Sequence, residues 1–266
     1  MQAVGPDGVS VYYEEHGSGA PTIVLVPGLA ADAGFWAAMI PELARQRRVL
    51  VLDPRGVGRS DCPEVAYTVA DLARDALAVL SAAEAGPADL VGHSFGALVA
   101  ARLAAEQPAA VRSVVLFSPF VRLPLGARLA LTAAGMFYRS DPAPMREMAT
   151  ALLPWLYSWP FLEKWLPDLI RLSVQNPRPQ PRHGFEGQLA ALLDVDASQW
   201  ARRVGARALV VAAEHDLLVP PAAAADVVAQ LPQAELVTVP EAGHCSPVEQ
   251  PRQCARLVMD FLAGPR

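Results

Sequence analysis

The stretch that decides the fold of this 266-residue chain is Ala88-Asp89-Leu90-Val91-Gly92-His93-Ser94-Phe95-Gly96. Its apolar beginning predicts a buried strand, and the residues that follow, 97–107, have a helical pattern. A Gly-X-Ser-X-Gly sequence between a strand and a helix is typical of a nucleophile elbow, where glycines leave room for a strained turn that exposes the serine oxygen. The alternative is a simple tight turn. The context favours Ser94 as a nucleophile.

An elbow serine needs a carboxylate and then a histidine further along the chain. The apolar run 208–213 predicts a strand, and Asp216 follows it closely. Glu214 and Asp226 are the rival carboxylates. His244 lies in the loop 240–246, after a further strand-like run and before a final amphipathic helix. We therefore predict Asp216 as the acid and His244 as the base.

These three residue types match the needs of acyl transfer. A serine hydroxyl is a poor nucleophile until a histidine accepts its proton, and the histidine needs a carboxylate to fix its tautomer and stabilise its charged form. On this interpretation Ser94 attacks, His244 moves the proton and Asp216 orients His244.

Together with the turn Asp53-Pro54-Arg55-Gly56-Val57-Gly58-Arg59-Ser60, these ordered motifs resemble the α/β-hydrolase family over essentially the whole chain. The resemblance implies that the serine, aspartate and histidine meet at the carboxyl ends of a mostly parallel sheet. Some members of the family take the acid from an earlier strand end. Here that place holds Ser118-Pro119-Phe120, which contains no carboxylate, and this favours Asp216.

The resemblance also implies an oxyanion hole of two backbone N–H groups. In elbow enzymes one belongs to the residue after the nucleophile, which here is Phe95. By position after the strand-like run 22–26, Leu29 corresponds to the second. The chain departs from the family pattern there, because it has Pro27-Gly28 where a His-Gly pair is common. The hydrogen bonds that normally brace this loop therefore cannot all form.

Strand-like and helix-like segments alternate along most of the chain, which predicts an α/β fold with a parallel sheet covered by helices on both faces. The expected strands are 9–14, 23–26, 49–53, 88–91, 114–117, 209–213 and 236–239, and the expected helices are 35–45, 69–84, 97–107, 222–230 and 250–262. The resemblance adds an eight-stranded type of sheet with an inserted helical cap. We expect a core of residues 1–119 and 198–266 and a cap of residues 120–197.

The predicted cap is rich in aromatic residues and proline. In the family a cap at this place shapes the substrate pocket, so we expect a small apolar or ring-containing substrate, although the rings could simply pack the cap onto the sheet. The residues proposed to contact substrate are Gly28, Trp155, Trp159 and Cys245. The Pro-rich stretch 176–182 predicts a hinge or loop.

Composition excludes several other classes of protein. The net charge is −5 without a basic run, which argues against nucleic acid and anionic membranes as partners. No apolar run of 18 residues and no leader pattern is visible, so we expect a cytoplasmic protein. Three cysteines without metal spacing predict reduced thiols, and the proposed chemistry needs no metal or cofactor.

Three functions fit these observations. The first is a hydrolase that cleaves a small ester, lactone or related carbonyl compound through an acyl-enzyme. The second is a non-hydrolytic relative that uses the same three residues for a lyase step, an elimination or a cyclisation. The third is a hydrolase-like module that only binds a small molecule. The sequence leaves the substrate and the oligomeric state undetermined.

Overall fold

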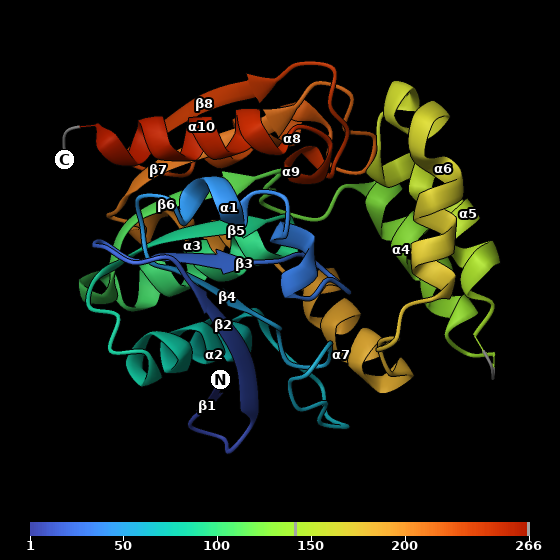
Figure 1. Ribbon diagram of the computed structural model, residues 1–266, viewed down its shortest axis with the longest axis horizontal. Helices are drawn as coiled ribbons and strands as arrows, with labels where there is room; N and C mark the ends of the chain where they lie inside the picture. Colours follow the sequence, from blue (N-terminus) through green and yellow to red (C-terminus); the bar gives the residue numbers. More distant parts are fainter. Residues whose placement is uncertain (141–142, 265–266) are drawn as a thin grey trace.

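An eight-stranded sheet forms the centre of the computed structural model, which describes residues 1–140 and 143–264 (Figure 1). The strands are β1 (Gln2–Val4), β2 (Ser10–His16), β3 (Ile23–Val26), β4 (Val49–Leu52), β5 (Ala88–His93), β6 (Val111–Phe117), β7 (Arg207–Ala213) and β8 (Ala234–Val239). Their spatial order is β1-β2-β4-β3-β5-β6-β7-β8. Strand β2 is antiparallel to β1 and β4, and all other neighbours are parallel. The predicted α/β class with a mostly parallel sheet is confirmed.

The central strands are apolar on both sides because each side faces a separate core. In β3, Val24 and Val26 belong to one hydrophobic cluster, whereas Ile23 and Leu25 belong to the other. Successive side chains of a strand point to opposite faces, so a continuous apolar run supplies both layers. This explains why these strands read as short uninterrupted apolar stretches in the sequence.

Helices cover both faces of the sheet. One cluster includes side chains from α2 (Val69–Ala82), α3 (Phe95–Glu106) and α8 (Pro221–Val228). The other includes side chains from the 3₁₀ turn η1 (Ala33–Trp36), α1 (Ile40–Leu43) and α10 (Pro251–Ala263). Three more 3₁₀ turns, η2 (Pro108–Ala110), η3 (Ala197–Gln199) and η4 (Ala201–Arg203), and the short helix α9 (Ser246–Glu249) complete this part of the chain. The prediction of helices on both faces is confirmed.

Two local predictions differ from the structure. The helix expected over 35–45 is divided into η1 and α1, with Pro41 in the first turn of α1. Proline has no N–H and its ring clashes with the carbonyl four residues earlier, so Pro41 is well tolerated in the first turn of α1 and disfavours one continuous helix from residue 35. Strand β1 was not predicted, since three residues are too few to show a periodic pattern.

Four helices lie between β6 and β7 in the chain, and we call them the inserted helices: α4 (Leu125–Phe137), α5 (Met145–Leu156), α6 (Trp159–Val174) and α7 (Arg182–Leu193). In Figure 1, α4, α5 and α6 form a group beside the sheet, and α7, which contacts α4, lies lower in the view. Residues 176–181 between α6 and α7 are neither helix nor strand.

Four residues lie outside the described part of the chain: Asp141 and Pro142 of the predicted cap, and Pro265 and Arg266 of the predicted core. In the described part of the chain, no helix combines the length and the apolar character that crossing a membrane requires.

A buried ion pair anchors the turn after β4. The Arg55 guanidinium donates from Nε and Nη2 to the two Asp75 carboxylate oxygens, at 2.6 Å each, and from Nη1 to Asp7 at 2.8 Å. Arg55 is 3% exposed and Asp75 only 1%. Removing one partner of a buried pair leaves an uncompensated charge, which costs far more than replacing both with apolar residues.

We expect Asp75→Leu to lower the free energy of unfolding by about 3 to 5 kcal/mol, because it leaves the Arg55 charge buried with only the half-exposed Asp7 carboxylate. The double variant Arg55→Met/Asp75→Leu should be less destabilised than Asp75→Leu alone. Urea denaturation of the three proteins measures both effects. A double variant that is less stable than the single one would contradict this account of the pair.

Candidate active site

A cavity of about 610 Å³ opens where the parallel strands end. Its wall includes residues that follow four different strands: Gly28 after β3, Ser94 after β5, Leu218 after β7 and His244 after β8. The inserted helices supply the opposite wall. In open α/β sheets, ligands bind in the crevice outside the carboxyl ends of the strands, so this cavity is the candidate site.

Ser94 occupies a strained position between β5 and α3. Its backbone has φ 53° and ψ −117°, outside the regions that L-residues favour. A Cβ atom at Gly92 would collide with Gly96 and Ala97, and one at Gly96 would collide with the carbonyls of Val26 and Pro27. The two glycines therefore let α3 start almost against the ends of β3 and β5, which turns Ser94 towards the cavity.

His244 lines the same cavity as this serine and is bonded to Asp216. His244 Nδ1 lies 2.8 Å from Asp216 Oδ2, and both residues are buried. The other carboxylate oxygen, Oδ1, accepts hydrogen bonds from the backbone N–H groups of Leu218 (3.0 Å) and Val219 (2.7 Å). The carboxylate is thus oriented by its own loop. A proton on Nδ1 completes the bond to Asp216 and leaves Nε2 as the nitrogen that can accept a proton.

The rival carboxylates lie elsewhere. Glu214 is exposed and accepts a hydrogen bond from the backbone N–H of Glu241 at 2.8 Å. Asp226 is exposed on α8. Ser94 and His244 both line the cavity, and among the described residues Ser94 Oγ has no hydrogen-bond partner.

A second histidine supports the loop that carries His244. His93 is buried, and its Nε2 lies 2.9 Å from the His244 backbone carbonyl, so Nε2 must donate. Its ring stacks on Phe35 and lies 4.7 Å, centroid to centroid, from the His244 ring. Burial, assisted by the neighbouring His244, lowers the pKa of His93 well below its usual range. His93 is therefore a neutral donor that holds the base in place.

Two backbone donors near Ser94 are free. In the part of the chain that the structure describes, neither the Phe95 N–H nor the Leu29 N–H has a hydrogen-bond acceptor. Phe95 is the first residue of α3, where intrahelical acceptors are lacking. Leu29 lines the cavity, and a Cβ atom at the preceding Gly28 would stand 3.4 Å from Ser94 Cβ. The loop after β3 thus lies directly against the elbow.

The residues predicted to contact substrate divide into two groups. Gly28 and Cys245 line the cavity. Trp155 instead packs beside Gly126 of α4, and Trp159 is 63% exposed at the start of α6, so neither lines it. Burial raises the pKa of the Cys245 thiol well above its usual range, which keeps it protonated and unreactive.

Most of the cavity wall was not predicted from the sequence. Leu123, Leu131, Met145, Met148, Leu152 and Phe185 line it, together with Tyr157 and Tyr138. Apolar side chains at helical spacing look the same in a sequence whether they face a core or a pocket. Aromatic content drew attention to α5 and α6, but aliphatic residues of α4 and α5 form much of the surface.

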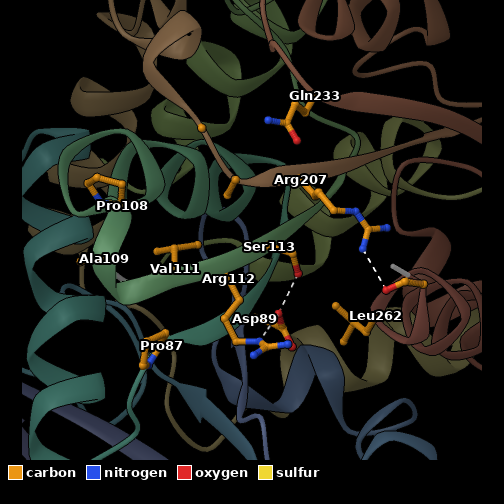
Figure 2. A pocket seen from close by; sticks show the side chains of 13 residues that line it. Pro87, Asp89, Pro108, Ala109, Val111, Arg112, Ser113, Arg207, Gln233 and Leu262 are labelled. Atoms are coloured by element: carbon orange, nitrogen blue, oxygen red, sulfur yellow. Dashed lines mark hydrogen bonds and ion pairs between the residues drawn. The ribbon is translucent and has the colours of Figure 1, made fainter. Parts of the chain in front are cut away.

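A second cavity, of about 520 Å³, lies at the opposite edge of the sheet, where β5, β6 and β7 begin. Figure 2 shows Arg112 and Ser113 beside Asp89, with Arg207 on the neighbouring strand. Asp89 Oδ1 accepts from Ser113 Oγ at 2.8 Å and lies 3.4 Å from Arg112 Nε, while Arg207 Nη1 donates to the Gly264 carbonyl at 3.2 Å. Asp89 and Ser113 are thus bonded to each other, and the described residues that line this cavity include no histidine that could accept a proton from a serine.

The described residues do not form a recognisable set of metal ligands. Within residues 1–140 and 143–264, no three His, Cys, Asp or Glu side chains come together in a group that could hold a metal ion. The polar groups of the candidate site are suited instead to nucleophilic attack and proton transfer.

Comparisons with known proteins agree with this fold. A family model described as alpha/beta hydrolase fold matches residues 21–251. A curated relative from Klebsiella pneumoniae (strain 342), named "Putative carbamate hydrolase RutD", is 30% identical over 251 residues, which are 92% of each chain. The solved enol-lactonase from Burkholderia xenovorans LB400 is 26% identical, with a TM-score of 0.89 over 99% of this chain and 100% of its own. A hydrolase from Pseudomonas aeruginosa PA01 is 29% identical, also with a TM-score of 0.89, over 99% of this chain and 98% of its own.

We expect Ser94→Gly to be more stable than Ser94→Ala by about 1 kcal/mol, because only glycine adopts the backbone angles of residue 94 without strain. Both variants lack Oγ, so their difference in free energy of unfolding isolates the backbone. Urea denaturation measures it. Equal stability would show that the turn is relaxed in solution.

Proposed function

This chain belongs to the alpha/beta hydrolase fold family, and from that premise we propose that it is a serine hydrolase that cleaves a small ester, lactone or related carbonyl substrate through an acyl-enzyme on Ser94. The protein is a hydrolase, as its relatives are. The proposal concerns the bond it cleaves and the residues that cleave it. It also takes the insertion of residues 120–197 to be a cap over the site.

One observation carries the proposal. Ser94, Asp216 and His244 follow three different strands. Ser94, with its strained backbone, and His244 line one cavity, and His244 Nδ1 lies 2.8 Å from Asp216 Oδ2. Such a bond orients an imidazole for proton transfer, and a strained elbow presents a nucleophile. Burial of Asp216 and His244 keeps water from weakening their interaction.

In the first half of the reaction, Ser94 Oγ attacks the carbonyl carbon while its proton moves to His244 Nε2. The resulting oxyanion receives hydrogen bonds from the N–H groups of Leu29 and Phe95. As the tetrahedral intermediate collapses, the bond to the leaving group breaks and His244 returns the proton to it. Asp216 stabilises the imidazolium throughout but stays ionised.

In the second half, water replaces the leaving group. His244 accepts a proton from the water as its oxygen attacks the acyl carbon of Ser94. The same two N–H donors stabilise the second oxyanion. Collapse breaks the ester to Ser94, His244 returns the proton to Oγ, and the acid product leaves.

The shape and lining of the cavity support a small apolar substrate. Its volume of about 610 Å³ falls in the usual range for small-molecule sites. Leu131, Met148 and Phe185 in its wall suit an aliphatic or ring-containing group. Among the relatives, one is named for carbamate and another for enol-lactone hydrolysis, and both reactions begin with attack on an acyl carbon. An ester or lactone is thus the first class to test.

Ser94→Ala should lose nearly all activity, on the order of 10⁶-fold if it behaves as in a studied protease. A fluorophosphonate should add one adduct to the wild-type protein and none to Ser94→Ala, because only an activated serine reacts. Intact-mass spectrometry detects the adduct. The exposed Ser81→Ala variant is the matched control and should label fully; an adduct that persists in Ser94→Ala would assign the nucleophile elsewhere.

Turnover in ¹⁸O-labelled water should place one labelled oxygen in the acid product, because water supplies the oxygen that cleaves the acyl-enzyme. Mass spectrometry of the product measures the label. A non-hydrolytic relative with the same three residues would form product without it. Unlabelled product would therefore overturn hydrolysis while leaving the roles of the three residues open.

A further inference from the structure

A buried glutamine of α7 holds the loop that contains Leu29. Gln188 has no exposed surface, and its Oε1 accepts a hydrogen bond from the Ala30 backbone N–H at 3.0 Å. Its Nε2 donates to the Arg55 carbonyl at 2.7 Å. One side chain from the inserted helices therefore connects the loop after β3 with the turn after β4.

A second glutamine fixes the orientation of the first. Gln180, in the segment between α6 and α7, donates from Nε2 to the Gly56 carbonyl at 3.0 Å and to Gln188 Oε1 at 3.2 Å. Both partners are acceptors, so the Gln180 amide cannot be reversed without opposing oxygen to oxygen. The Gln188 amide is likewise fixed, since its Oε1 receives two donors and its Nε2 meets a carbonyl. The two amides thus have one arrangement.

The Ala30 N–H that Gln188 accepts from belongs to the central peptide of a turn, and the orientation of that peptide defines the turn type. The Ala31 N–H lies 3.3 Å from the Gly28 carbonyl, so residues 28–31 form a β-turn with Leu29 and Ala30 at its centre. Ala30 has φ 60°, the positive value that a type II turn requires at this position and that glycine normally supplies. Types I and II differ by a flip of the central peptide, whose N–H is the group that Gln188 accepts from.

We propose that Gln188 is a positioning residue for the oxyanion hole. By holding the Leu29–Ala30 peptide through an amide fixed by Gln180, it holds Leu29 in place, and with it the N–H on the other side of that residue. The proposal rests on the proposed function. Alanine disfavours positive φ, so the turn needs an outside partner to remain in this form. Gln180 and its neighbour Arg178 also line the cavity, which couples the wall of the substrate site to the donor loop.

Gln188→Met removes the three hydrogen bonds of this side chain at nearly constant volume. We expect kcat for a 4-nitrophenyl ester to fall about 10- to 100-fold with little change in KM, because an oxyanion donor acts in the transition state. The value of kcat is calculated from the concentration of protein that a fluorophosphonate labels at Ser94. Leu189→Ala is the matched control: it weakens the packing of α7 against α4 without touching the turn, and its kcat should be unchanged.

Ala30→Gly provides a rescue that a purely structural role would not give. Glycine adopts positive φ freely, so Gln188→Met should lose less kcat in the Ala30→Gly background than in the wild type. If Gln188→Met does not fold, Gln180→Met tests the same arrangement, with an expected loss of up to about tenfold.

The outcomes separate the two hypotheses. A wild-type protein that neither labels at Ser94 nor hydrolyses esters would overturn the proposed function, and the inference with it. A wild type that does both, beside a Gln188→Met variant that folds and keeps its kcat, would overturn the inference alone. A loss of kcat that Ala30→Gly does not reduce would also overturn it, since Gln188 would then act by another route.

Discussion

The close approach of α3 to the end of β3 is the constraint on which the site depends. The chain must turn from β5 into a helix at a single residue, and this is possible only because Gly92 and Gly96 lack side chains. The same approach brings Pro27 and Gly28 against the elbow, with Gly28 beside His93 and Ser94. One packing requirement therefore positions both the proposed nucleophile and the loop that carries a proposed oxyanion donor.

Buried and partly buried polar side chains then hold the surrounding loops. Asp53 Oδ1 accepts from the Ala33 N–H at 2.8 Å at one end of the loop after β3, and Gln188 accepts from Ala30 within it. On the other side, Glu249 Oε1 accepts from the Gly243 N–H at 2.9 Å and the Ser158 N–H at 3.0 Å, tying the His244 loop to the start of α6. An unpaired buried polar group costs about 1 to 3 kcal/mol, so each loop has a strong preference for its observed position.

The sequence could predict what depends on local order. The strands were visible as apolar runs, and the elbow as two glycines at a spacing that one turn requires. The bond between Asp216 and His244 followed from their places after successive strands, because parallel strands bring their ends together. The cavity wall could not be predicted, since Trp155 and Met148 lie on the same helix and only packing decides which of them faces the cavity. Nor could the partner of Ala30, which is 158 residues away in the chain.

The proline at position 27 shows why such distant partners matter. The histidine common at this place in the family is absent, and side-chain hydrogen bonds reach the loop from Gln188 of α7 and from Asp53, directly after β4. Gln188 is itself fixed by Gln180 and by the Arg55 carbonyl, and Arg55 is fixed by its buried pair with Asp75. The position of the loop after β3 therefore depends on a side chain of α7. The insertion that shapes the cavity wall also holds, through Gln188, the loop of the proposed oxyanion donor, so a change that displaces Gln188 would alter the reactivity of the site together with its specificity.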